Sequence, residues 1–369
     1  MLTINIPFFF GAQDESLNIL KPQILPFHYF YNKDLKLFQQ KSTHKLDKLL
    51  LSVYKEGSMM NGEMDFNDGG LQGQAALDFI LQNIGGKKYL TILEIGCGNG
   101  FLLKELHKKS YLCVGLEPGP QSRILSEKYP EMHLINDFFP SKHLTDSMEK
   151  FDVILHFNVI EHIKDPIAFL EEHKKLLNKS GIIIFGVPNC EPNLMNGDNS
   201  IFLHEHFNYF TRDSLVEVAK KIGLKIHKLK TGANNGMIFC SMMSDSQSKY
   251  QPSNYPWQTF NTKKYIQNIK IEIEKYNEVD IAIYCPIRAM NVLSMINAFH
   301  CRLIDDTPTL FNKYIPPLKS SVENFASLVD RPPKLIIIFS RTFGKEIFAK
   351  CRSNVNLMNT KILLIENFI

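Results

Sequence analysis

The residues best suited to chemistry begin with a glycine-rich stretch in the first half of the chain, which contains Glu94, Gly96, Gly98, Asn99 and Gly100. This stretch follows an apolar run of strand length and precedes a helical pattern. Glycines at such a junction let the backbone approach a ligand closely. They predict a ligand site, but they do not by themselves identify the ligand.

The charge of Glu94 distinguishes among the ligands that such loops bind, which are dinucleotides, nucleotides and S-adenosylmethionine (SAM). A carboxylate two residues before the first glycine would lie near a pyrophosphate and repel it. The same carboxylate would stabilise the ammonium and sulfonium groups of SAM. No Gly-Lys-Ser or Gly-Lys-Thr follows the loop, which argues against a Walker-type phosphate loop. The sequence therefore favours SAM as the cofactor.

Five further candidate cofactor contacts follow the next apolar runs. Glu117 ends the second run, where an acid can accept both hydrogens of a ribose diol. After the third run, Asp137 could offer an acceptor to the adenine amine and Phe138 an apolar wall to its ring. Phe157 and Asn158 end the fourth run and would face the cofactor from the carboxyl edge of a parallel sheet, where ligands usually bind.

The elements that must position these residues alternate between strands and helices. Apolar runs of strand length lie at 90–95, 112–116, 132–135, 153–157 and 182–187. Helical patterns separate them, which predicts a parallel sheet with helices on both faces. After a helix at 213–222, two strands at 225–229 and 236–242 suit an antiparallel edge. We therefore expect an α/β fold with a Rossmann-like core and a seven-stranded mixed sheet.

The same residues resemble a known family in their order and spacing. The glycine-rich stretch, the acid at 117, the pair at 137–138 and the segment 158–162 are similar to the motifs of class I SAM-dependent methyltransferases. The similarity extends from about residue 90 to residue 242. It implies SAM as the cofactor and methyl transfer as the reaction. A decayed site on a domain that serves only as a scaffold is the alternative.

A second α/β pattern follows a stretch rich in Ser, Gln, Pro and Tyr. Its alternation, which includes a helix at 322–329, predicts a second, smaller Rossmann-like domain. The N-terminal part shows little periodicity apart from a helical pattern at 46–54, and residues 61–70 are rich in turn formers. The predicted organisation is an N-terminal extension or lid (1–70), a SAM-dependent methyltransferase domain (71–244), a linker (245–262) and a C-terminal Rossmann-like domain (263–369).

An acid and a base lie side by side in the chain after the fifth apolar run, at Glu205 and His206. A neutral imidazole beside a carboxylate could take a proton from an acceptor as the methyl group leaves sulfur. The surrounding pattern Glu-His-Phe-x-Tyr-Phe is similar to sugar C-methyltransferases that act on nucleotide-linked keto-deoxysugars. By this resemblance His206 is the candidate general base and Glu205 its partner. The pair could instead only fasten the loop.

The leading hypothesis is therefore a methyltransferase for a small-molecule acceptor, foremost a carbohydrate or nucleotide-activated sugar, methylated at carbon or oxygen. One alternative is methyl transfer to another small molecule, such as a quinone or lipid precursor. A second is a non-catalytic subunit that keeps the SAM-binding fold. The C-terminal pattern also resembles the sugar-methylating family, whereas the N-terminal four-cysteine zinc module of that family is absent, because the first cysteine is Cys97.

Composition sets further expectations. The net charge of +4 comes from scattered lysines without a basic stripe, so we expect no nucleic-acid partner. Seven widely spaced cysteines form no CxxC pair, and no group of residues has the spacing of metal ligands, so we expect neither disulfides nor a metal. No signal peptide or apolar run of membrane length is evident. We expect a cytoplasmic monomer or homodimer without a membrane partner.

Overall fold

The chain is described by a computed structural model that divides into two compact units. The described residues are 1–9, 11–14, 24–55, 70–144, 150–245, 250, 252–253 and 255–369. One unit contains residues 30–189 and 205–255, and the other contains residues 1–29, 190–204 and 256–369. The predicted turn-rich connection at 61–70 lies outside the described residues except for Gly70. The domain limits expected from the sequence stay a prediction.

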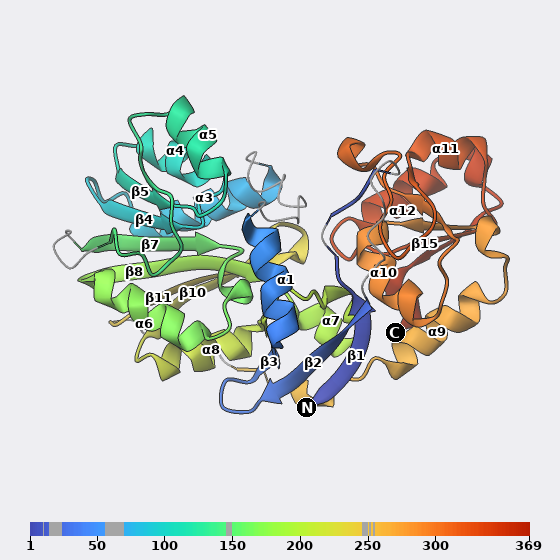
Figure 1. Cartoon of the computed structure of the whole chain (residues 1–369), viewed down its shortest axis with the longest axis horizontal. Helices are drawn as coiled ribbons and strands as arrows, with labels where there is room; N and C mark the ends of the chain where they lie inside the picture. The colour runs from blue at the N-terminus through green and yellow to red at the C-terminus, as the bar shows by residue number, and fades with distance from the viewer. Residues whose placement is uncertain are drawn as a thin grey trace. The chain divides into compact units, whose positions relative to one another are not determined.

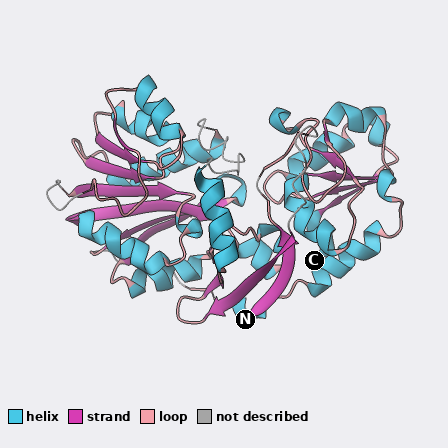
Figure 2. Cartoon of the chain, viewed as in Figure 1, coloured by secondary structure: helices cyan, strands magenta, loops and turns pink. Residues whose placement is uncertain are grey.

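The larger sheet belongs to the unit that carries the glycine-rich stretch (Figures 1 and 2). Its strands are β4 (Thr91–Ile95), β5 (Leu112–Leu116), β6 (His133–Ile135), β7 (Phe151–Phe157), β8 (Leu177–Pro188), β10 (Lys225–Thr231) and β11 (Met237–Met243). They lie in the order β10-β11-β8-β7-β4-β5-β6. Strands β4 to β8 pair in parallel, whereas β11 is antiparallel to β8 and β10. The predicted seven-stranded mixed sheet is confirmed.

Helices cover both faces of this sheet. They include α3 (Leu71–Ile84), α4 (Phe101–His107), α5 (Gln121–Lys128), α6 (Pro166–Leu176) and α8 (Arg212–Lys221). Successive residues of a strand point to opposite faces, so Val153 packs in the core under α3 and α4, whereas Ile154 packs under α6 and α8. Figure 1 shows α4 and α5 on one side of the sheet and α6 and α8 on the other. This two-sided burial explains why the central strands read as continuous apolar runs.

The second unit contains a smaller, fully parallel sheet. Its strands are β12 (Ile281–Tyr284), β13 (Arg302–Ile304), β14 (Val322–Glu323), β15 (Leu335–Ile338) and β16 (Lys361–Leu364), and its helices include α7 (Glu191–Met195), α9 (Lys263–Ile273), α10 (Pro286–Met295), α11 (Phe325–Asp330) and α12 (Gly344–Arg352). The strand order is β14-β13-β12-β15-β16, with every pair parallel. Strand order reverses at β12, as in Rossmann folds, and the predicted second α/β fold is confirmed.

The helix predicted at 322–329 is wrong in its first part. Val322 and Glu323 form the edge strand β14, which pairs with β13. The helix α11 begins only after Asn324, whose side-chain oxygen accepts a hydrogen bond of 3.0 Å from the backbone N–H of Ser327. Asparagine is a strong N-cap, so this residue fixes the start of the helix.

The N-terminal part contains strands that the sequence analysis does not predict. They are β1 (Leu2–Pro7), β2 (Ile24–Asn32) and β3 (Leu37–Gln40), followed by the predicted helix as α1 (His44–Lys55). Strand β1 pairs antiparallel with β2, and β3 pairs antiparallel with the short strand β9 (Asn208–Tyr209). The β3–β9 pair matters for the site, because β9 directly follows the predicted catalytic residues.

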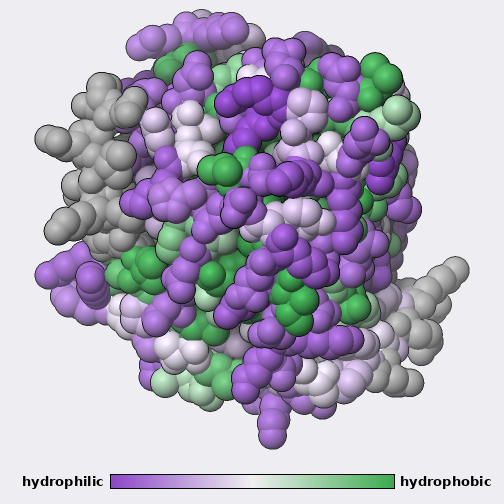
Figure 3. All heavy atoms as spheres, turned by 90° about the vertical axis from the view of Figure 1, so that its right-hand side faces the viewer, coloured by the Kyte–Doolittle hydropathy of each residue, from purple (hydrophilic) through white to green (hydrophobic). Residues whose placement is uncertain are grey.

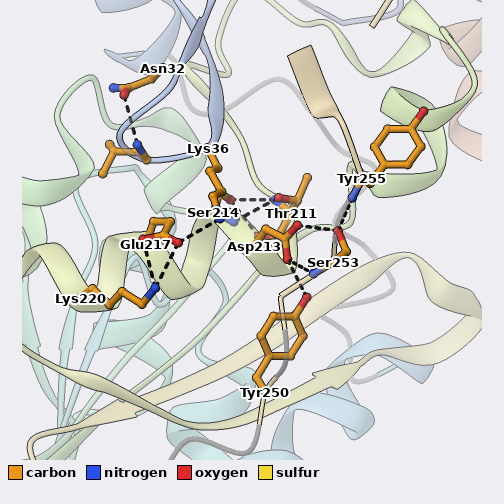
Figure 4. A network of polar contacts seen from close by, with 11 residues as sticks. Asn32, Lys36, Thr211, Asp213, Ser214, Glu217, Lys220, Tyr250, Ser253 and Tyr255 are labelled. Carbon is orange, nitrogen blue, oxygen red and sulfur yellow. Dashed lines mark hydrogen bonds and ion pairs between the residues drawn. The ribbon is translucent and has the colours of Figure 1, made fainter. Parts of the chain in front are cut away.

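The start of α8 is held by a buried carboxylate. Asp213 is 1% exposed, and it accepts hydrogen bonds from the Tyr250 hydroxyl at 3.0 Å and from the backbone N–H of Ser253 at 2.8 Å. Figure 4 shows these bonds together with the capping of α8 by Thr211. Residues 250 and 253, which fall in the predicted linker, are therefore hydrogen-bonded to the unit that contains the seven-stranded sheet.

The surface is mixed in polarity. Figure 3 shows a face on which hydrophilic side chains predominate and hydrophobic ones are scattered among them. Within the described part of the chain, no helix combines the length and the apolar character that crossing a bilayer requires.

Candidate active site

The glycine-rich stretch connects the end of β4 to the start of α4, as predicted. Gly96, Gly98 and Gly100 have positive φ angles of 71°, 50° and 69°, in a region that glycine enters without a steric penalty. The N–H of Gly96 donates to the carbonyl of Leu116 at the end of β5, at 2.7 Å. This bond ties the loop to the end of β5, and Glu117 is the next residue after that strand.

Glu94 is a buried acid with an unmet need for a partner. It lies in β4, is 3% exposed, and its Oε2 accepts no hydrogen bond from any residue that the structure describes. Burial, and to a smaller extent the nearby Glu117 carboxylate, raises the pKa of Glu94 to about 8. A cation beside it would restore the ionised form at neutral pH. This environment fits the ammonium and sulfonium groups of SAM.

Glu117 is held in place by the loop that it faces. Its Oε2 accepts from the backbone N–H of Gly98 at 3.0 Å, and its Oε1 accepts from that of Gly119 at 2.7 Å. A carboxylate offers about four acceptor sites, so two hydrogen bonds leave capacity for a further pair of donors. The orientation is therefore fixed before a ligand arrives, and the residue fits the predicted contact with a ribose diol.

Asp137 and Phe138 follow β6 at the same edge of the sheet. Asp137 accepts hydrogen bonds from the backbone N–H of Phe138 at 2.8 Å and from the Ser141 hydroxyl at 2.7 Å. These bonds hold the pKa of the Asp137 carboxyl below its ordinary value, so the group is ionised at neutral pH. The Phe138 side chain is 55% exposed and thus accessible to a ligand ring. Their predicted adenine contacts stay a prediction.

The end of β7 turns sharply. Phe157 is buried, and Asn158 has a positive φ of 54° while its N–H donates to the carbonyl of Gly186 at 3.1 Å. Asparagine tolerates this left-handed conformation better than most residues do. The turn carries the chain off the sheet edge into a short 3-10 turn, η2 (Ile160–His162).

Three side chains that can bind a proton or a metal meet beyond this turn. Glu161 and His162 come from η2, and His206 comes from the segment before β9. One ligand atom from each of the three lies within 4.8 Å of the other two. The rings of His162 and His206 meet edge to face with their centroids 4.7 Å apart. The backbone N–H of Phe207 donates to the Glu161 carbonyl at 2.6 Å, which fastens the two segments together.

The tautomer of His162 follows from its hydrogen bond. Its Nδ1 lies 3.1 Å from the backbone carbonyl of Glu205. A carbonyl oxygen can only accept, so Nδ1 carries the proton and Nε2 carries a lone pair. Burial lowers the pKa of His162 to about 4, so the ring is neutral at physiological pH.

Asn208 locks the two segments from behind. Its side-chain amide donates to the carbonyls of Ile160 at 3.1 Å and Ile163 at 2.6 Å, on either side of η2. Its side-chain oxygen accepts from the Gln39 amide at 2.8 Å, from strand β3. Asn208 is 1% exposed, so these bonds are shielded from water. The cluster therefore stands on a fixed support.

The structure thus places the predicted base, His206, next to Glu161 and His162. Glu205 contributes its backbone carbonyl to His162, and the catalytic roles predicted for Glu205 and His206 stay a prediction. Neither Glu161 nor His162 is among the predicted catalytic residues. The signal that could have found them is the Glu-His pair in the fourth-strand segment, which repeats the Glu-His pair at 205–206. His204 belongs to the other unit, where its ring packs on aromatic side chains.

A hollow of about 400 Å³ lies between α4 and α5. Asn99, an exposed residue predicted to contact the cofactor, lines it together with Phe101 and side chains of α4 and α5. Among these, Lys104 and Lys128 lie over the ring of Tyr129. None of the other predicted cofactor residues lines this hollow, and the contact of Asn99 with the cofactor stays a prediction.

The chain was compared with known protein families once this geometry was established. Residues 69–229 match the model of a family described as a methyltransferase domain. This part of the chain is therefore similar to a methyltransferase domain.

Individual relatives match only part of the chain. A ubiquinone biosynthesis O-methyltransferase of Cereibacter sphaeroides is 27% identical over 148 residues, which are 37% of this chain and 60% of that protein. One of Azorhizobium caulinodans is 31% identical over 105 residues, 28% of this chain and 42% of that protein. The chain thus spans at most about three fifths of the length of these two relatives.

Solved structures match the chain at low identity and with low TM-scores. The magnesium protoporphyrin IX methyltransferase of Synechocystis with bound SAH has a TM-score of 0.40 and 14% identity, covering 55% of this chain and 95% of that chain. A putative methyltransferase of Haloferax volcanii, solved with the Trm112 activator, has a TM-score of 0.41 and 13% identity, covering 52% and 97%.

Proposed function

We propose that this protein transfers the methyl group of SAM to a small-molecule acceptor. The observation that carries the proposal is Glu94, a buried acid whose Oε2 has no hydrogen-bond partner among the described residues, placed beside a glycine-rich loop at the carboxyl edge of the sheet. A site without a ligand would leave this acid uncompensated, which costs free energy. Glu117, already oriented by the loop amides, would complete the contact with the ribose.

Methyl transfer is an in-line displacement that asks little covalent chemistry of the protein. An oxygen or carbon of the acceptor forms a bond to the methyl carbon, the carbon–sulfur bond breaks, and its electron pair goes to sulfur. The acceptor also loses a proton, which a nearby base takes. His206, beyond the end of β7, is the group that we assign to this proton, with Glu205 as its neighbour. The main contribution of the protein is the alignment of donor and acceptor.

The acceptor that we favour is a carbohydrate, foremost a nucleotide-activated sugar. Two features support it. The pattern Glu205 to Phe210 is similar to sugar C-methyltransferases, and the chain adds a second parallel α/β unit of the kind found in those proteins. Binding SAM needs only the unit that carries the glycine-rich loop. The second unit would then be available to bind the nucleotide part of a nucleotide-linked sugar.

A second candidate acceptor is a hydroxylated aromatic ring, such as a quinone precursor. Several relatives that align with residues of the methyltransferase-like part are ubiquinone biosynthesis O-methyltransferases. In this case the methylated atom is a phenolic oxygen, which is acidic enough to need only modest help in losing its proton.

Two measurements test the proposal. Calorimetry with the full chain should show SAM binding that Glu117→Ala weakens at least tenfold, whereas the exposed Glu127→Ala on α5 leaves it unchanged. Incubation with isotope-labelled SAM and a panel of nucleotide sugars and dihydroxybenzoid compounds, followed by mass spectrometry, should reveal a labelled product. SAM binding that is equal in both variants would overturn the ribose assignment, and label found only on aromatic acceptors would replace the sugar by the second candidate.

A further inference from the structure

Glu161, His162 and His206 form a set of side chains that the methyl transfer proposed above does not require as a group. Methyl transfer to oxygen needs one base at most, yet a carboxylate and two imidazoles gather here within 4.8 Å of one another. One of the three, Glu161, is 1% exposed. A buried carboxylate that meets two imidazoles at this spacing has the composition of a metal site.

The geometry points to a binding site for one divalent transition-metal ion, and we propose that Glu161, His162 and His206 are its ligands. Two histidines and one carboxylate are a ligand set that proteins use for zinc and for iron, with further positions left open to water or substrate. Around zinc, with ligands at about 2.1 Å, neighbouring ligand atoms lie about 3.4 Å apart. The three ligand atoms here lie within 4.8 Å of one another, so an ion must draw them closer together.

The orientation of His162 supports this assignment independently. Metal-binding histidines almost always donate their other ring N–H to a carbonyl or carboxylate, which fixes the tautomer and points the lone pair at the metal. His162 meets this condition, because Nδ1 donates to the Glu205 carbonyl at 3.1 Å and leaves the lone pair on Nε2. The Glu205 carbonyl thus acts as the outer support of a ligand.

The backbone around the cluster is fixed as a metal site requires. The bond from Phe207 to the Glu161 carbonyl and the two bonds from Asn208 to the carbonyls flanking η2 join the segments that supply the three ligands. None of these bonds uses a side chain of the ligands themselves. A site held in this way loses little conformational freedom when the ion binds.

The chemistry of the three ligands limits which metal ions the site would bind. Magnesium and calcium prefer oxygen ligands, whereas two imidazoles favour zinc, iron or cobalt. The sequence alone predicts no metal, since Glu161 and His206 stand 45 positions apart along the chain and no ligand spacing is visible. The cluster is formed only when the segment before β9 packs on η2.

The proposed ion lies at the same edge of the sheet as the cofactor loop. Strands β7 and β4 are parallel neighbours, and η2 follows the carboxyl end of β7 as the loop follows that of β4. The open positions of the ion would receive a hydroxyl oxygen of the acceptor and hold it toward the methyl donor. Binding of the ion does not depend on the proposed methyl transfer, but this role does. The lone pair of His206 can bind either the metal ion or the proton of the acceptor, but not both. Measuring turnover with and without the metal shows which of the two His206 binds during the reaction.

The test is metal binding by the full chain, freed of any affinity tag and treated with a chelator. Titration with Co²⁺ should produce visible absorption bands of a protein-bound ion at about one equivalent, and Zn²⁺ should displace it. Mg²⁺ should produce no competition at the same concentration. His206→Ala and Glu161→Gln should each weaken Co²⁺ binding at least tenfold. The exposed His133→Ala, on β6, is the matched control and should bind as the unchanged protein does.

Several outcomes decide the matter. Equal Co²⁺ binding in His206→Ala and the unchanged protein, or binding that His133→Ala also removes, overturns the assignment. Circular dichroism in chelator shows whether Glu161→Gln folds, and if it does not, the partly exposed His206→Ala decides alone. SAM calorimetry in chelator is read separately, so that SAM binding without metal binding rejects this inference and leaves the proposed function standing. Metal binding without any labelled product supports the metal site and rejects the proposed methyl transfer.

Discussion

Val159 occupies the space into which a side chain at position 96 would project. A Cβ built on Gly96 would lie 2.6 Å from Cγ2 of Val159, closer than carbon atoms approach in folded proteins. The glycine-rich loop and the segment that leads into η2 are therefore in direct contact. This contact helps to set the distance between the cofactor loop and the cluster of Glu161, His162 and His206. A larger residue at position 96 would therefore change the spacing between the loop and the cluster.

Gly96→Ala is expected to weaken SAM binding at least tenfold. The added methyl group must displace Val159, and the positive φ of 71° is costly for alanine, by about 1–2 kcal/mol. Both effects shift the loop at the point where the cofactor approaches the backbone. Calorimetric titration with SAM measures the loss directly.

The matched control for this variant is Gly85→Ala. Gly85 has a similar φ of 60° at the end of α3, but no atom lies within 4 Å of its built Cβ. Its replacement should lower the free energy of unfolding by a similar backbone cost and leave SAM affinity unchanged. If both variants lose affinity equally, the effect belongs to general strain and not to the contact with Val159.

SAM binding at pH 7 is expected to release close to one proton from Glu94. The pKa of Glu94 is raised to about 8 in the free protein, so its carboxyl is mostly protonated, and a bound cation favours the ionised form. Calorimetry in buffers of different ionisation enthalpy counts this proton. Glu94→Gln should abolish the release, whereas Glu127→Gln on the surface should not. A release that survives in Glu94→Gln would assign the proton to another group.

The same raised pKa predicts how the stability of the free protein depends on pH. A folded pKa of about 8 lies above the ordinary value of 4.5, so the folded state holds the proton more tightly. The stabilisation is fully present below pH 4.5 and decreases as the pH rises toward 8. Chemical denaturation at pH 6 and pH 9 should show a fall in the free energy of unfolding that is smaller in Glu94→Gln.

The core of the fold follows from the sequence because its strands are buried on both faces. The run 182–187 is a continuous apolar stretch, the run 153–157 is interrupted only by His156, and the structure has strands at both. Strand β2 shows where this approach fails. Leu25, Phe27 and Tyr29 are buried at alternate positions, a strand signal, but Pro26 between them and the aromatic Phe30 and Tyr31 after them obscure the alternation.

The site was predictable only as far as it is local in sequence. The positions of Glu94, the glycines and Glu117 at the sheet edge follow from a strand, a turn and a helix in succession, which periodicity reveals. The meeting of Glu161 with His206 depends on how a later loop packs back on η2. That packing rests on the bonds of Asn208, a residue whose spacing carries no signal.

Acid is expected to destabilise the protein between about pH 6.5 and pH 4 through buried histidines. Burial lowers the pKa of His173 to about 4 and that of His156 well below 6.5, so only the unfolded chain takes up protons in this range. Stability is complete above pH 6.5 and falls as the pH decreases. His156→Phe keeps the stacking on Phe185 and should flatten this dependence, measured by denaturation at several pH values, whereas the exposed His133→Phe should not.

Asn208→Ala is expected to reduce turnover while leaving SAM binding intact. The variant loses the two bonds that clamp η2, at about 1–3 kcal/mol for a buried network of this kind, and frees Glu161 and His162 from their alignment with His206. Asn178→Ala is the matched control, because its amide also donates two hydrogen bonds, to the Lys150 carbonyl at 3.3 Å and to the Asp152 carboxylate at 2.7 Å, but at the opposite end of the sheet. Both variants should lower the free energy of unfolding, and only Asn208→Ala should lower kcat and any affinity for Co²⁺. Equal losses of kcat in the two variants would mean that Asn208 contributes stability alone.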